Sequence, residues 1–272
     1  MIPVSKLLLA PTPLVGCVFA AVWRDTRGVD LSDADRVSHF PASPLVSLTL
    51  VIHGELQVAA GDAPRCDVWV AAPGSFVMGP QNAPVTSWAT GEVTAVSIGF
   101  YHDAWLRLGG DPNFQEVPES LATALKALDS SDQPESGWSA FCAALSPVWA
   151  AIRPTDWLAA TGIADWARAA VTRAILPPAG NSIRSIERRI RRLSGQSKRT
   201  LEFFATFEEL HRLSRRQAGR SLAGLAQEAG YADQSHMGRA VRRASGFSPA
   251  RLNAAIENEE PFWCYRLFGE RF

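Results

Sequence analysis

The sequence predicts an α+β protein, with a β-barrel and flanking helices in its N-terminal part and an all-helical C-terminal part. Short β-branched or aromatic runs fill positions 15 to 101, whereas alanine and leucine become frequent from position 104 onward. The chain has 272 residues, of which 47% are hydrophobic, and this is enough for two hydrophobic cores. We therefore expect two domains, one over residues 1–150 and one over residues 155–272.

Strand-like runs recur through the N-terminal part, and turn signals such as His53-Gly54 and Gly91-Glu92 separate them. Short strands at regular spacing are typical of barrels and sandwiches. The apolar segment 1–21 is interrupted by prolines, so it is interpreted as strand-forming chain and not as a signal peptide. The runs are Val46–Ile52, Leu56–Ala59, Val68–Ala71, Ser75–Met78 and Val93–Phe100.

A ten-residue frame occurs twice in the C-terminal part. Residues 188–197 read RRIRRLSGQS and residues 239–248 read RAVRRASGFS. In each copy the apolar positions recur at spacings of three and four, and the arginines fall on the opposite side. Each copy is therefore predicted to be a short helix with a buried stripe and a basic face, closed by a glycine in the left-handed cap position.

The second copy lies in a helix-turn-helix pattern. The run from Leu222 predicts a first helix that Gly230 ends. After a short turn, Asp233 is placed to cap a second helix over Gln234–Ser245, and Pro249 begins a further helix. Two short amphipathic helices with a glycine turn between them are typical of units whose second helix enters the major groove of DNA.

The segment between the two copies, residues 200–217, is predicted to be one amphipathic helix. Eighteen residues at ~1.5 Å each give a rod of about 27 Å. Allowing for the width of the helices it joins, such a rod can hold two recognition helices about one DNA turn, ~34 Å, apart. Its buried side carries Leu201, Phe204, Phe207, Leu210 and Leu213.

Charge divides the chain in the same way. Residues 180–256 carry 15 Lys and Arg but 6 Asp and Glu, a net charge of +9, whereas residues 1–179 have a net charge of −7. The whole chain is neutral. A basic block segregated inside a neutral chain favours contact between the C-terminal part and a phosphate backbone.

The stretch from Ala226 to Pro249, AQEAGYADQSHMGRAVRRASGFSP, resembles the second helix-turn-helix of the AraC/XylS transcriptional regulators. The resemblance covers about residues 180–256. It implies a sequence-specific DNA-binding regulator in which a cupin-like N-terminal sensor or association domain precedes two helix-turn-helix units. The first unit departs from the pattern, because two prolines follow Leu176 and its first helix must end there.

The resemblance also implies roles for individual side chains. Residues at the start of each recognition helix face base edges, and arginines on the basic faces contact phosphates. The base-contact residues are Arg184, Ser185 and Arg188 in the first unit and Gln234, Ser235, His236 and Arg239 in the second. The phosphate-contact residues are Arg191, Arg192, Arg242 and Arg243.

The N-terminal part is expected to enclose a small-molecule effector behind aromatic walls. A regulator controlled by a partner protein stays open as an alternative. Further expected partners are double-stranded DNA and, for an activator, RNA polymerase; a homodimer is left open. The residues named for the effector pocket are Trp23, Phe40, Trp69, Phe76 and Trp88.

A cupin-type metalloenzyme is the alternative from another class. Such a site needs clustered histidines and a carboxylate, whereas His39, His53 and His102 lie singly on separate segments, so no metal and no cofactor are expected. No nucleophile elbow, P-loop or dinucleotide fingerprint occurs. The four cysteines are isolated, which favours reduced thiols in the cytoplasm, and no apolar run is long enough to predict a membrane span.

Overall fold

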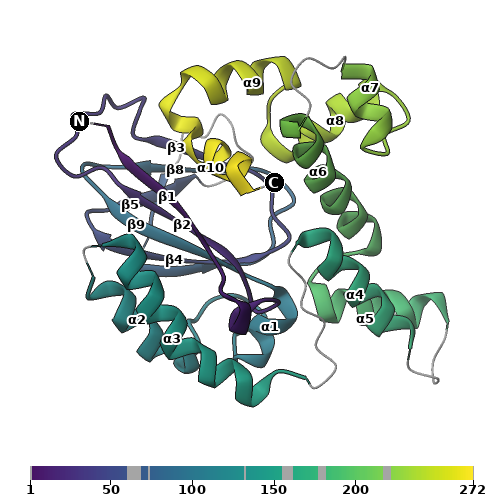
Figure 1. The fold of residues 1–272 in the computed structure, drawn as a ribbon, viewed down its shortest axis with the longest axis horizontal. Helices are drawn as coiled ribbons and strands as arrows, with labels where there is room; N and C mark the ends of the chain where they lie inside the picture. The colour runs from purple at the N-terminus through teal and green to yellow at the C-terminus, as the bar shows by residue number, and fades with distance from the viewer. Residues whose placement is uncertain are drawn as a thin grey trace.

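The computed structural model describes residues 2–59, 69–72, 74–131, 133–154, 162–176, 182–216 and 222–271 (Figure 1). Antiparallel strands form the N-terminal part and helices form the rest, which confirms the α+β class. The boundary expected near residue 155 adjoins residues 155–161, which lie outside the described residues.

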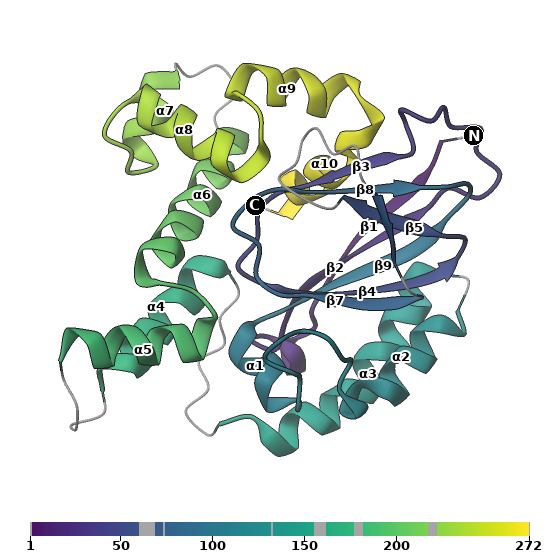
Figure 2. The ribbon, with the colours of Figure 1, turned by 180° about the vertical axis from the view of Figure 1, so that it is seen from behind.

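The strands pair into two sheets. The first has the order β1-β2-β9-β4-β7 and the second has the order β3-β8-β5-β6. In the described residues the isolated bridge of Ser43 with Gln81 is the only pairing outside these sheets, so the expected barrel-like part consists of two facing sheets and closure into one continuous sheet is not seen among the described strands (Figure 2). The strands are β1 (Val4–Leu9), β2 (Val18–Asp25), β3 (Val37–Phe40), β4 (Val46–His53), β5 (Leu56–Ala59), β6 (Trp69–Ala71), β7 (Ser75–Met78), β8 (Val85–Ala89) and β9 (Thr94–Phe100).

Most strand predictions are confirmed. Two runs, 56–59 and 75–78, match their strands at both ends, and 46–52 and 93–100 differ by one residue at one end. Of the run 68–71, Val68 lies outside the described residues. Strands β3 and β8 were not predicted individually, and both belong to the second sheet.

Helices α2 and α3 cover the outer face of the first sheet (Figure 1). Trp138 of α3 donates its indole N–H to the carbonyl oxygen of Leu9 in β1, at 2.9 Å. The helices are α1 (His102–Arg107), α2 (Ala122–Asp129), α3 (Pro134–Ile152), α4 (Ile163–Ile175), α5 (Ile183–Ser194), α6 (Lys198–Arg216), α7 (Leu222–Glu228), α8 (Gln234–Ser245), α9 (Pro249–Asn258) and α10 (Trp263–Arg271), with short 3-10 helices at Thr12–Leu14, Glu119–Leu121 and Glu260–Phe262.

The core of the first sheet continues into α4, α5 and the start of α6. Trp166 of α4 is fully buried, stacks at a tilt on Tyr101 and donates its indole N–H to Asp103 at 2.9 Å. Arg173 of the same helix forms an ion pair with Asp103 at 3.0 Å. These contacts fix the first helix pair against the sheet.

The second helix pair has its own core. Residues from the end of α6 through α10, including Met237, Leu252 and Phe262, pack into one cluster. Helix α10 then folds back onto β1 and β3, where Trp263 and Cys264 bury Val22 (Figure 2). Among the described helices, none is long and apolar enough to cross a membrane.

Candidate nucleic-acid interface and adjoining cavity

Each copy of the repeated frame forms a helix that ends on a left-handed glycine. Helix α5 ends before Gly195, whose φ is 68°, and α8 ends before Gly246, whose φ is 83°. The side chain of Asp233 accepts the backbone N–H of His236 at 2.6 Å and caps α8 over the predicted range. Ser182 caps α5 in the same manner through the N–H of Ser185.

The Ser-Gly pair of each frame builds the same corner. The buried Ser194 hydroxyl donates to the carbonyl of Ile190 at 2.8 Å and accepts the N–H of Gln196 at 3.2 Å. The buried Ser245 hydroxyl bonds Val241 and Phe247 at 2.8 and 3.1 Å. We call these turns, residues 193–196 and 244–247, the first and second corners.

The residues predicted to contact bases lie at the surface. All of them are exposed on α5 and α8 except Ser185, which is half-buried. The hydroxyl of Ser185 shares a hydrogen bond of 2.9 Å with the hydroxyl of Ser182. His236 also packs edge-on against Tyr231, which orients the imidazole at the helix start. The exposed members are Arg184, Arg188, Gln234, Ser235, His236 and Arg239.

The predicted phosphate-contact residues Arg191, Arg192 and Arg242 are exposed on the last turns of α5 and α8. Arg243 is exposed too, but its guanidinium lies 4.1 Å from the ring centre of Phe203 in α6. This stacking holds α8 against α6 and fixes the direction of one basic side chain.

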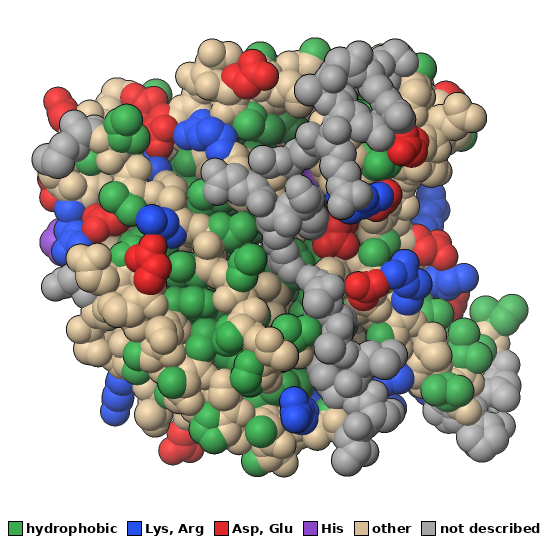
Figure 3. Space-filling model, viewed as in Figure 1, with side chains coloured by type: hydrophobic (Ala, Val, Ile, Leu, Met, Phe, Trp, Pro, Cys, Tyr) green, Lys and Arg blue, Asp and Glu red, His purple; other side chains and the backbone are tan. Residues whose placement is uncertain are grey.

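Helix α6 separates α5 from α8, the two helices predicted to read DNA. Its 19 residues give a rod of about 28 Å at ~1.5 Å per residue, with α5 near one end and α8 near the other (Figure 1). In Figure 3, Lys and Arg side chains with acidic ones among them lie along the right-hand edge, over this helical part. The geometry is that of two basic helices on one connector.

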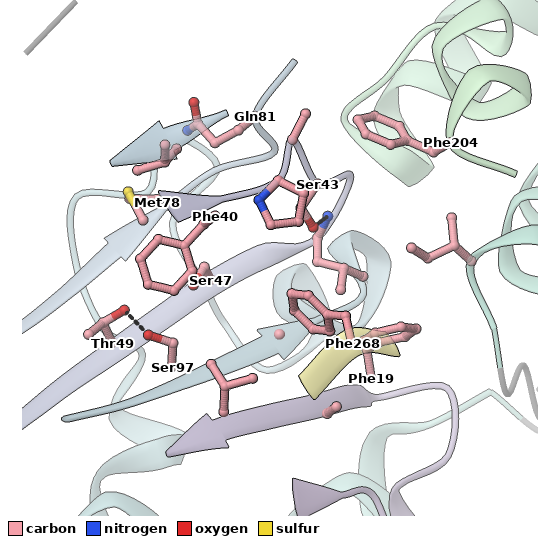
Figure 4. Close-up of a pocket in the computed structure, with 18 of the residues that line it drawn as sticks. Phe19, Phe40, Ser43, Ser47, Thr49, Met78, Gln81, Ser97, Phe204 and Phe268 are labelled. Atoms are coloured by element: carbon pink, nitrogen blue, oxygen red, sulfur yellow. Dashed lines mark hydrogen bonds between the residues drawn. The ribbon is translucent and has the colours of Figure 1, made fainter. Parts of the chain in front are cut away.

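A cavity of about 190 Å³ lies between the two sheets, α6 and α10. Figure 4 shows Phe40 from β3, Thr49 from β4, Phe19 from β2, Phe204 from α6 and Phe268 from α10 around this space. Both halves of the chain therefore build its wall.

The wall is mostly apolar and carries hydroxyl groups inside. Thr49 and Ser97 share a hydrogen bond of 2.8 Å between their hydroxyls. His211 lines the cavity, and burial lowers its pKa from 6.5 to about 4, so its imidazole is neutral at pH 7. The carboxylate of Glu208 accepts the N–H groups of Ile163 and Ala164 at 3.0 and 2.8 Å. The ligand that fits these groups is largely apolar, with a few hydrogen-bonding atoms.

The expected aromatic wall needs correction. Phe40 and Phe76 line the cavity. Trp23 is 1% exposed and belongs to the core of the first sheet, and Trp88 is not among the lining residues. The strand residue Trp69 has a side chain outside the described set. All the residues expected to line the pocket lie in the N-terminal part, so the lining residues of α6 and α10 were missed. Those of α6 were expected only to be buried, and those of α10 were not expected in any role; they are Phe204, Phe207, Tyr265 and Phe268.

The three histidines of the N-terminal part, which a metal site would need close together, lie in different places. His39 packs on Phe262 and Phe247, His102 bonds the carbonyl of Leu193 at 3.2 Å, and His53 ends β4. In the described part of the chain, no three His, Cys, Asp or Glu side chains converge.

Comparison with known proteins yields only distant likenesses. No family model and no curated protein matches the chain. A ToxT structure from Vibrio cholerae is similar at 11% identity over 79% of this chain and 93% of ToxT, with a TM-score of 0.41. An iron(II) structure of HppE is similar at 17% identity over 36% of this chain and 50% of HppE, with a TM-score of 0.27.

Proposed function

We propose that this protein is a sequence-specific DNA-binding transcriptional regulator of the AraC/XylS type, controlled by a small apolar effector. The observation that carries the proposal is the duplicated helix with exposed base-reading positions and a basic face, once in α5 and once in α8. Two such helices on one α6 connector suit adjacent major grooves of a duplex. A single chain would then bind two half-sites.

Effector control is supported by the cavity. Its wall combines strands of the expected sensor domain with α6, the connector of the two DNA-reading units. A ligand held there touches both parts at once, so its binding can favour one arrangement of them. The cavity chemistry, hydroxyls within an apolar wall and a neutral His211, favours an uncharged ligand.

The test of DNA binding uses the full chain and a pool of random duplexes. Repeated selection followed by sequencing should yield two half-sites about one helical turn, ~10 base pairs, apart. Binding of every sequence alike, with no enriched motif, would contradict a sequence-specific regulator. No enrichment and no binding at low salt would remove DNA as a partner altogether.

A further inference from the structure

Two segments at the mouth of the cavity form one rim. We define the rim as residues 39–43, which are the end of β3 and the three residues after it, and residues 79–81, which follow β7. Ser43 and Gln81 join them through two backbone hydrogen bonds, of 3.0 and 2.8 Å. Phe40, Pro41, Ala42, Ser43, Gly79 and Gln81 all line the cavity. A ligand that fills the cavity would therefore contact both segments, which lie on the same side of it in Figure 4.

The outer side of the rim touches the second corner. The N–H of Ala42 donates to the carbonyl of Ala244, the last turn of α8, at 2.8 Å. His39 packs its ring against Phe247 and Phe262 at centroid distances of 5.7 and 4.8 Å. The end of one recognition helix is thus seated on residues 39–42.

The first corner meets the rim at Pro80. A Cβ added to Gly195 would lie 3.3 Å from Pro80 Cγ and 2.8 Å from His102 Cδ2. Next to it, His102 donates from Nδ1 to the carbonyl of Leu193 at 3.2 Å. The end of the other recognition helix is thus seated on Pro80 and on the start of α1.

Phe40 is the rim residue whose ring a ligand in the cavity would contact. Its ring lines the main cavity and a second, smaller one of about 40 Å³ that also reaches Arg24 and Trp263. Phe40 packs edge-on against Trp263 of α10 at 5.7 Å. A ligand that contacts this ring therefore contacts the strand end that continues directly into Pro41 and Ala42.

We propose that the rim is a coupling device: occupancy of the cavity shifts residues 39–43 and 79–81 together, and each segment repositions one Ser-Gly corner and its recognition helix. The inference rests on the proposed function and assigns its regulation to named contacts. The Ser-Gly half of the repeated frame then has a role of its own, which is to dock each DNA-reading helix on the rim, while the arginine half faces DNA.

The experiment measures linkage between cavity and DNA in the full chain. The cavity probe is N-phenyl-1-naphthylamine, an uncharged apolar fluorophore, and the DNA is the duplex enriched from the random pool. DNA affinity is measured with and without saturating probe, and the ratio of the two affinities is the coupling factor. For the unaltered protein we expect a factor of about 5 or more, in either direction.

Two variants each weaken the contact between the rim and one corner. His39→Ala removes the ring contact with Phe247 of the second corner and leaves the Ala42–Ala244 hydrogen bond, and Gly195→Ala forces the first corner away from Pro80 and His102. Each should lower the coupling factor towards 1, because one of the two corners no longer follows the rim, and leave probe affinity unchanged. His39 also shares a hydrogen bond of 3.1 Å with the hydroxyl of Thr86, which His39→Ala removes together with the ring contact. Thr86→Val is therefore the control, because it removes this hydrogen bond and leaves the ring of His39 in place. Gly109→Ala is the control for Gly195, because its φ is also positive and an added Cβ meets nothing within 4 Å.

The outcomes separate the two proposals. Native coupling in both folded variants would overturn the rim device and leave the regulator standing. The same holds if the unaltered protein binds probe and DNA without any coupling. If the probe does not bind, the effector cavity and the rim device fall together while DNA binding stands. Absence of DNA binding removes the regulator itself.

Discussion

Single side chains show that the net charge of the basic block, residues 180–256, is larger than the positive charge left free to contact a phosphate backbone. The basic block contains Arg189, whose Nε donates to the carbonyl of Ala174 at 2.6 Å, and Arg251, which pairs with Glu259 at 2.7 Å. The first of these contacts joins α5 to α4, and the second lies within α9 and its C-cap. The exposed arginines of α5 and α8 remain as the groups that can neutralise phosphates, so a count of residues overstates the charge available for DNA.

Replacement of Arg239 by Ala should flatten the base preference at one or two positions of the selected site. Arg239 is exposed on the first turns of α8, where a guanidinium can pair with guanine in the major groove for ~1–3 kcal/mol of discrimination. Selection with the variant measures the preference at each position. An unchanged motif would show that Arg239 does not read bases.

Replacement of Arg242 by Ala should weaken binding to all sequences equally. Loss of one full phosphate contact lowers the log–log salt slope by about 0.9. The matched control is Arg251→Ala, because that guanidinium is engaged with Glu259 and its loss should leave the slope unchanged. The two proteins are compared by titration at several salt concentrations. Equal slopes in both would place Arg242 away from the backbone of DNA.

Glu208 stabilises α4 from another helix. The residue before α4 is Gly162, which has no side chain to cap it, and the two carboxylate oxygens accept the first free N–H groups instead. Glu208→Ala should therefore cost ~1 kcal/mol of unfolding free energy, the usual value of an N-cap. Urea unfolding measures this loss. Glu202→Ala is the control, because Glu202 forms only an exposed ion pair with Lys198 and its replacement should cost less than ~0.5 kcal/mol. Equal losses would contradict the capping role.

Among the secondary-structure elements, the two corners show that a repeated sequence gives repeated geometry. In both, a buried serine closes the last helical turn and accepts an N–H beyond the glycine. The rest of each helix pair differs in its surroundings. The first shares the core of the sheet through Trp166, and the second has a separate core around Met237.

Ser194→Ala and Ser245→Ala should destabilise the protein by similar amounts. Each change leaves a backbone N–H without its acceptor, that of the buried Gln196 or that of the half-buried Phe247, and an unsatisfied buried donor costs ~1–3 kcal/mol. Ser214 on α6 provides the control, because its exposed hydroxyl only bonds the carbonyl of His211. Chemical denaturation compares the three. A loss confined to one corner would mean that the two corners are not equivalent.

At the scale of the whole molecule, three histidines lie where the sheets meet the C-terminal helices: His39, His102 and His211. Burial lowers the pKa values of His39 and His102 and lowers that of His211 from 6.5 to about 4. The unfolded chain therefore binds more protons than the folded chain below the unfolded pKa. The stability that these neutral histidines contribute is fully present above pH 6.5, and the part from His211 is lost as the pH falls from there towards about 4.

The His211→Phe variant should lose less stability than the unaltered protein between pH 7 and pH 5. Phenylalanine keeps the ring that packs edge-on against Phe207 and removes the proton site. Urea unfolding at both pH values measures the difference, with the exposed His53→Gln variant as control. An identical loss in all three proteins would assign the acid sensitivity to other groups.

Short-range interactions were readable from the sequence. Helix α8 was predicted over its observed range because its cap, its apolar spacing and its terminal glycine all lie within a few residues of one another. The strands 56–59 and 75–78 were found for the same reason, since turn residues flank short β-branched or aromatic runs.

Long-range packing set the rest. The return of α10 onto β1, the shared wall of the cavity and the rim beneath both corners join residues more than 100 positions apart. The apolar stripe of α6 shows why these were missed: Phe204 and Phe207 satisfy helical periodicity whether they face a helix or a cavity. Periodicity specifies which side chains leave water, and the chain's path in three dimensions specifies what they meet there.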